Sequence, residues 1–124
     1  MSYYIIIRGP LGSGKSTISE KLAHKLDAEH VHMDEVLEQN GLDKMPPDAP
    51  CISAENFIKA NEIVLPEVKQ LLDDGKIVIF DACFYHKEVI EHLVQNLPYE
   101  HCIFTLKAPL ELCVQNMSEF LGYC

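Results

Sequence analysis

A glycine-rich turn between an apolar run and a helical pattern is the feature that most limits how this chain can fold. The run is YYIIIR, at residues 3–8, and the turn follows as GPLGSGKS, at residues 9–16. The turn meets every fixed position of the pattern G-x-x-x-x-G-K-[ST], and a strand before it and a helix after it are the context in which this pattern holds phosphate. Glycines let successive backbone N–H groups face inward, and the dipole of the following helix reinforces the anion site. The stretch therefore predicts a phosphate-binding loop at the first strand-to-helix turn.

Side chains in this turn have separate expected roles. We expect Lys15 to bring a positive charge to the terminal phosphates and to act in catalysis, Ser16 to hold a magnesium ion, and Thr17 to donate to an inner phosphate. The alternative is a flexible glycine turn with a solvated lysine, which the pattern and its context disfavour. The predicted nucleotide-binding residues are Gly9, Gly12, Ser13, Gly14, Lys15, Ser16 and Thr17.

Composition limits the classes of protein that remain. A chain of 124 residues, 48% of them hydrophobic, is long enough for one domain with a core, and we expect residues 1–124 to form a single domain. The net charge of −9 makes a long contact with nucleic acid unfavourable, because that contact needs many Lys and Arg side chains. The five cysteines form no Cys-x-x-Cys pair, which favours a reduced, cytoplasmic chain. We see no apolar stretch of the roughly 20 residues that a membrane span needs.

Strand-like and helix-like patterns alternate along the chain. Apolar runs predict strands at 3–8, 76–81 and 101–106, and residues 29–33 give a weaker strand signal because their histidines make them less hydrophobic. Periodic apolar positions predict helices at 16–26, 54–73, 86–96 and 110–121. Pro66 interrupts the second helix, so either that helix kinks or two helices meet there. Residues 40–50 are rich in Gly, Pro and Asp and predict an exposed loop. The alternation predicts an α/β fold: a three-layer sandwich with a mostly parallel sheet of about four to five strands.

With these elements in place, the chain resembles the small kinases of the P-loop superfamily, similar to adenylate, shikimate, gluconate and adenylylsulfate kinases. The resemblance runs from residue 3 to about 116, and rests on the loop at 9–17, on Asp34, on the strand ending at Asp81 and on LKAPLELC at 106–113. It implies ATP and Mg²⁺ as cofactors, and transfer of the ATP γ-phosphate to the hydroxyl of a small molecule. The chain has no Asn-Lys-x-Asp and no Leu-Ser-Gly-Gly-Gln stretch, which disfavours a GTPase or a transporter ATPase.

Two carboxylates follow predicted strands at the carboxyl edge of the sheet, where open α/β sheets bind ligands. The resemblance implies that Asp81 contacts magnesium, often through water; the alternative is a cap of the following turn. Asp34, expected at the end of the second strand, is by resemblance the candidate catalytic base that takes the proton of the acceptor hydroxyl. The alternative is that Asp34 and Glu35 only favour the positive start of a short helix.

Two histidines precede Asp34 on the second strand. Because alternate residues of a strand point to one side, His30 and His32 could form a metal site with Asp34. We disfavour that interpretation, since no second ligand group with helical His spacing supports it.

The chain departs from the family pattern in its charge and its C-terminus. Kinases of this kind place arginines on a mobile lid after the fourth strand, whereas Arg8 is the single arginine here, at the end of the first strand. The family pattern continues with a lid, a fifth strand and a last helix, while this sequence stops at MSEFLGYC. We expect a homo-oligomer to cover the sheet edge that a missing strand would leave open.

Three hypotheses follow for function. The first is an ATP-dependent small-molecule kinase, and the second is a nucleotide-binding module that needs a partner or a further C-terminal segment for catalysis. The third is a polynucleotide 5′-kinase, which the net acidity disfavours. The sequence names neither the acceptor nor the nucleotide base.

Overall fold

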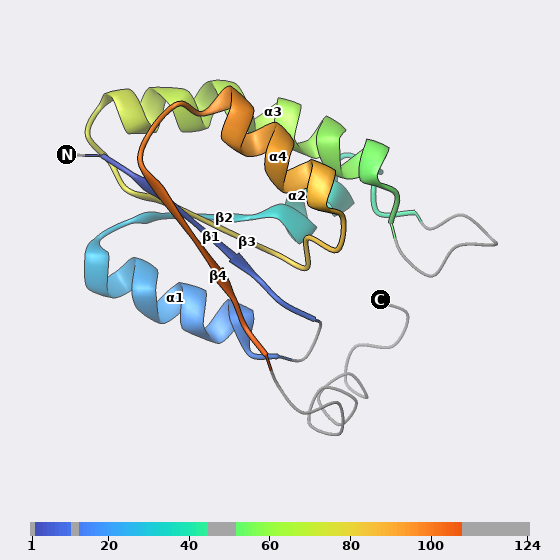
Figure 1. Cartoon of the computed structure of the whole chain (residues 1–124), viewed down its shortest axis with the longest axis horizontal. Helices are drawn as coiled ribbons and strands as arrows, with labels where there is room; N and C mark the ends of the chain where they lie inside the picture. The colour runs from blue at the N-terminus through green and yellow to red at the C-terminus, as the bar shows by residue number, and fades with distance from the viewer. Residues whose placement is uncertain (1, 11–12, 45–51, 108–124) are drawn as a thin grey trace.

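A parallel sheet covered by helices forms the framework of the chain (Figure 1). The computed structural model describes residues 2–10, 13–44 and 52–107. Its strands run side by side in the order β2-β3-β1-β4, and every neighbouring pair is parallel. The elements are β1 (Tyr4–Arg8), α1 (Lys15–Leu26), β2 (Glu29–His32), α2 (Met33–Gln39), α3 (Ala54–Asp73), β3 (Val78–Ala82), α4 (Lys87–Asn96) and β4 (His101–Thr105). The predicted α/β fold is confirmed, with a four-stranded sheet among the described residues.

Alternation along the central strands creates two apolar faces. Ile5, Ile7 and Ile79 pack with Ala23 of α1 on one face. The residues between them in the strands, such as Ile6, belong to a larger core beneath α2, α3 and α4. Figure 1 shows α1 on one side of the sheet and these three helices on the other. The sheet is therefore buried on both faces, which explains why β1 and β3 read as continuous apolar runs.

The second strand is shorter than predicted. It ends at His32, and Met33, expected to be its last residue, is fully buried and begins α2. A helix of seven residues is too short to give a clear periodic pattern, so the sequence predicts α2 only as the alternative in which Asp34 and Glu35 begin a short helix. The third strand begins at Val78, because the N–H of Lys76 instead donates to the carbonyl of Leu71 in the preceding turn.

Pro66 lies inside one continuous helix of 20 residues, which excludes the alternative in which two helices meet there. Both Pro66 and Glu62 are exposed, and water can therefore satisfy the carbonyl that loses its N–H partner. Ser53 caps the start of α3, where its hydroxyl accepts from the N–H of Asn56 at 3.2 Å.

Three expectations concern residues outside the described ranges. The predicted helix at 110–121 and positions 45–50 of the predicted loop lie there, and so does most of LKAPLELC. In the described ranges, no helix combines the length and the apolar character that crossing a membrane requires.

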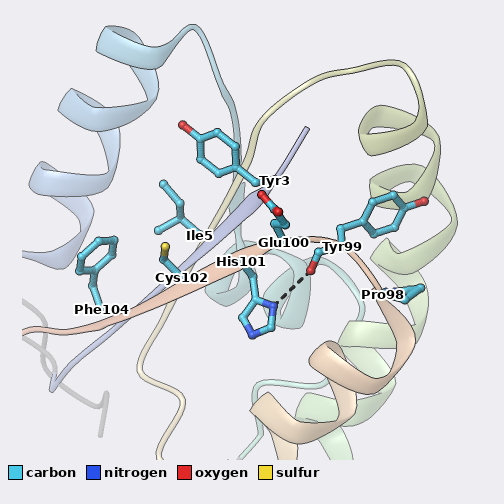
Figure 2. Close-up of a pocket in the computed structure, with 8 residues that line it drawn as sticks. All are labelled: Tyr3, Ile5, Pro98, Tyr99, Glu100, His101, Cys102 and Phe104. Carbon is cyan, nitrogen blue, oxygen red and sulfur yellow. Dashed lines mark hydrogen bonds between the residues drawn. The ribbon is translucent and has the colours of Figure 1, made fainter. Parts of the chain in front are cut away.

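The described part of the sheet has an open edge at β4. All five residues of β4 are exposed, and Ile103 and Phe104 are 44% and 50% accessible. A shallow depression of about 890 Å³ follows β4 and the start of β1, with Tyr3, Tyr99 and Phe104 in its lining (Figure 2). Its lining includes no residue of the 9–17 loop, so this depression is separate from the predicted phosphate site.

Candidate phosphate and metal site

The loop between β1 and α1 has the backbone geometry that its glycines predict. Gly14 lies immediately before α1 with φ of 88°, in the left-handed region where a side chain is strained. The N–H of Ser13 donates to the carbonyl of Pro10 at 3.1 Å, which closes part of the turn. The chain therefore enters α1 through a conformation that glycine adopts readily.

Gly9 is required for a different reason, which is space. A Cβ at this position would lie 2.9 Å from the Ser13 hydroxyl and 3.1 Å from the carbonyl oxygen of Leu106. Leu106 is held in place because its N–H donates to the carbonyl of Arg8 at 2.8 Å. The loop thus packs directly against the end of β4, and only glycine fits without a shift.

The start of α1 has the properties of an anion site. The first turn of this 12-residue helix contains no acidic residue, and Ser16 and Thr17 are exposed there. The side chain of Lys15 is buried and forms no ion pair with the described residues. Within the same part of the chain, the Ser13 hydroxyl is buried without a hydrogen-bond partner. Unused N–H groups, an unneutralised lysine and an unsatisfied hydroxyl together favour a bound anion.

Of the predicted nucleotide-binding residues, Gly12 lies outside the described residues. The other six lie along one turn, in the loop that ends at Gly14 and in the first turn of α1. Their individual contacts with phosphate remain predictions.

Asp81 lies on β3 and is almost fully buried, with 3% of its surface accessible. Strand register places it opposite Ile7 of β1 on one side and His32 of β2 on the other. Its Oδ2 lies 3.3 Å from His30 Nε2 and 3.6 Å from His32 Nδ1, whereas its Oδ1 has no hydrogen-bond partner among the described residues. A buried carboxylate oxygen without a partner is costly, which indicates that a cation or water belongs beside it.

Asp34 is the second residue of α2, two residues beyond the end of β2. It lies in the first turn of α2 and not at the end of β2, so its predicted position on the strand is wrong. Burial raises the pKa of Asp34 above its usual value, the positive charge of Lys15 opposes that rise, and Asp81 adds to it. Asp34 and Glu35 do lie at the start of a short helix, as the structural alternative expected. The charges of Lys15 and Asp81 nevertheless both act on the Asp34 carboxylate.

His30 and His32 lie together, and their ring centroids are 3.7 Å apart. Burial, with His32 as a second cause, lowers the pKa of His30 below its usual value. The carboxylate that joins them is Asp81 and not the expected Asp34, because β2 pairs with β3 in the sheet. The sequence does not predict this pairing, because the patterns of the separate strands do not define their order in the sheet.

A protein-family model matches most of this sequence. The model of the AAA domain family matches residues 5–119. Among curated proteins, none matches the sequence.

Solved structures show the same fold. A sugar kinase from a Janibacter species is 19% identical, with a TM-score of 0.77, and the match covers 99% of this chain and 70% of that one. The Mycobacterium tuberculosis APS kinase in complex with AMPPNP and APS is also 19% identical, with a TM-score of 0.75 and coverage of 97% and 70%. A chain of the Pnkp1/Rnl/Hen1 RNA repair complex is 21% identical, with a TM-score of 0.74 and coverage of 98% and 38%.

Proposed function

This chain belongs to the AAA domain family, and from that premise we propose that it is a small-molecule kinase that binds ATP with Mg²⁺ and transfers the γ-phosphate to an acceptor hydroxyl. The observation that carries the proposal is the largely buried side chain of Lys15 at the start of α1, directly after the left-handed turn at Gly14; it forms no ion pair with the described residues. A phosphate would supply a close negative partner for its ammonium group.

The residues fit the phosphates of ATP. Lys15 can neutralise the terminal phosphates, and the free N–H groups of the first helical turn can donate to them. The Ser13 hydroxyl, buried and without a partner among the described residues, can also donate to a phosphate oxygen. Exclusion of water around Lys15 strengthens these interactions, because charges attract more strongly in a low-dielectric site.

We propose Ser16 and Asp81 as the residues that hold the metal ion. Ser16 offers an exposed hydroxyl in the first turn of α1, and Asp81 offers the unpartnered Oδ1. When bound, Mg²⁺ supplies charge neutralisation for the β- and γ-phosphates.

Asp34 is the proposed base for the acceptor hydroxyl. Its raised pKa makes the carboxylate a better proton acceptor than an ordinary aspartate, and the charge of Lys15 opposes part of that rise. The acceptor remains an unspecified hydroxyl compound.

Two alternatives have specific support. A nucleotide-binding module without independent catalysis would fit a chain whose single arginine is Arg8, since phosphoryl transfer commonly uses arginines to stabilise the transferred group. A polynucleotide 5′-kinase would fit the structural likeness to a chain of the RNA repair complex, although the net charge of −9 opposes it. A cytoplasmic location and a homo-oligomer that covers β4 remain part of the proposal.

Calorimetric titration of the purified chain with Mg·ATP and Mg·ADP tests the nucleotide site. Lys15→Ala should weaken Mg·ATP binding by about 10- to 100-fold, since a hydrogen bond to a charged group contributes about 1.5–3 kcal/mol. The matched control is Lys21→Ala, which removes an exposed lysine from the same helix.

Equal affinity of the wild type and Lys15→Ala for Mg·ATP would refute the assignment of the loop. Binding that depends on Lys15 would justify a screen of hydroxyl acceptors, with labelled γ-phosphate as the readout. Binding without transfer to any acceptor would favour the nucleotide-binding module, and transfer to a 5′-hydroxyl of RNA would favour the polynucleotide kinase.

A further inference from the structure

Three metal-binding side chains meet on the α1 face of the sheet. His30 and His32 alternate on β2, and strand register sets His32 directly opposite Asp81 of β3. The neighbouring residues on that face, Ile7 and Ile79, pack against α1, so these three polar side chains share the side of the sheet on which α1 lies. One potential ligand atom from each side chain lies within 4.8 Å of the others.

The spacing of these atoms suits a metal ion better than a set of hydrogen bonds. Two ligands on a tetrahedral zinc ion are about 3.3 Å apart, because each bond is about 2.0–2.1 Å long. Asp81 Oδ2 lies 3.3 Å from His30 Nε2 and 3.6 Å from His32 Nδ1. The 3.3 Å approach of His30 is also a hydrogen-bond distance, whereas the 3.6 Å approach of His32 is too long for one.

Burial and solvent access differ across the cluster. Asp81 is 97% buried. The side chains of His30 and His32 are 12% and 30% accessible, so an ion could enter from the β2 side. Asp81 thus lies on the buried side of the cluster, and the two histidines lie on the side that solvent reaches.

We propose that His30, His32 and Asp81 form a binding site for a transition-metal dication, with Zn²⁺ as its best-fitting occupant. Imidazole nitrogen suits Zn²⁺ and its transition-metal neighbours, whereas Mg²⁺ is bound by carboxylates, phosphates and water. Three protein ligands leave a fourth tetrahedral position open, as in zinc sites that bind a water or a substrate oxygen. Asp81 pairs with Ile7 of β1, the strand that leads into the loop.

The inference rests on the proposed function only in setting this ion next to the phosphates of ATP. Binding of the metal itself needs no nucleotide, so it can be measured on the metal-free, reduced chain. Failure of the metal site then leaves the Lys15 titration unaffected, and failure of the nucleotide site leaves the metal titration interpretable.

The experiment is a titration with Zn²⁺ by calorimetry and with Co²⁺ by visible absorption. We expect one equivalent of each metal to bind, a tetrahedral Co²⁺ spectrum, and no displacement by a large excess of Mg²⁺. His30→Ala and Asp81→Asn should each weaken Zn²⁺ binding by more than about 100-fold, since even loss of an outer-shell partner costs 10- to 100-fold. His24→Ala, which removes an exposed histidine from α1, should bind as the wild type does.

Three results would overturn the proposal. The first is the absence of Zn²⁺ binding by the wild type. The second is equal Zn²⁺ affinity in the wild type, His30→Ala and Asp81→Asn, and the third is a thiolate-to-cobalt charge-transfer band, which would assign the metal to cysteine. Because the buried Asp81 could be needed for folding, His32→Ala serves as the third ligand variant. Its partly exposed side chain can be removed with little effect on the core, and it should lose Zn²⁺ binding while keeping the wild-type circular dichroism.

Discussion

Replacement of Gly9 by alanine tests how tightly the loop packs against β4. The added methyl group would lie 2.9 Å from the Ser13 hydroxyl, 3.1 Å from the Leu106 carbonyl oxygen and 3.2 Å from the Leu106 Cβ. Ser13 can rotate its hydroxyl away, but the backbone of Leu106 is tied to Arg8 by a hydrogen bond of 2.8 Å. The methyl group therefore has to displace backbone as well as a side chain.

The expected loss follows from two opposing effects. Overpacking of this kind costs about 1–3 kcal/mol. Alanine also restricts the unfolded chain, and at a position without positive φ this returns about 0.4–1 kcal/mol. Gly9→Ala should therefore lower the free energy of unfolding by about 1–2 kcal/mol. Part of that loss should disappear in a Ser13→Ala background, because the shortest contact is then gone.

Urea unfolding of the wild type, both single variants and the double variant measures this coupling. We expect Ser13→Ala alone to be nearly neutral, since its hydroxyl is buried without a partner among the described residues. The coupling between the two substitutions should be about 0.5–1 kcal/mol in favour of the double variant. Two results would show that Gly9 does not pack against Ser13 and Leu106 as described. The first is wild-type stability of Gly9→Ala, and the second is an equal loss of stability with Ser13 and with Ser13→Ala.

Two further substitutions test the proposed base and the core. Asp34→Asn should bind Mg·ATP as the wild type does and lower the rate of phosphoryl transfer by about 100-fold or more, because it removes the proton acceptor; unchanged turnover would exclude this role. Tyr4→Phe should lower the free energy of unfolding by about 1 kcal/mol or less, because the buried hydroxyl donates to the Leu97 carbonyl at 3.0 Å, which still accepts from the Tyr99 N–H. Burial raises the pKa of Tyr4 from 10.0 to about 12, so this residue favours the folded state below pH 10 and loses that contribution as the pH rises towards 12. Between pH 10 and 12, Tyr4→Phe should lose less stability towards urea than the wild type does. An identical loss in the wild type and in Tyr4→Phe would contradict the raised pKa of Tyr4.

Strong apolar patterns made most of the fold predictable from the sequence. β1 and β3 are buried on both faces and therefore appear as unbroken apolar runs, and α3 was predicted at Ala54–Asp73, the bounds that the structure has. The start of α2 was not predictable in the same way, because seven residues span only two helical turns. Because β2 ends at His32 and α2 begins at Met33, Asp34 lies in the helix and not on the strand.

The candidate site was predictable where one local pattern defines it, and not where two strands must meet. The loop and Lys15 come from a single continuous stretch, so their sequence order is also their spatial order. The partner of Asp81 depends on β3 lying between β2 and β1. That order follows from the packing of the whole sheet, and the patterns of the individual strands do not contain it.

The histidines of β2 explain both a weak prediction and the strongest chemical feature of the site. An aspartate at the end of β3 flanked by apolar residues would have water as its remaining partner, which is the environment that Mg²⁺ prefers. Asp81 has His30 and His32 beside its Oδ2, where nitrogen ligands favour Zn²⁺, while its Oδ1 is the oxygen proposed for Mg²⁺. The same two residues made residues 29–33 less hydrophobic and weakened the strand signal. A strand that keeps two imidazoles on a face otherwise packed by isoleucines gives up apolar burial there, and binding of a metal ion would offset that loss.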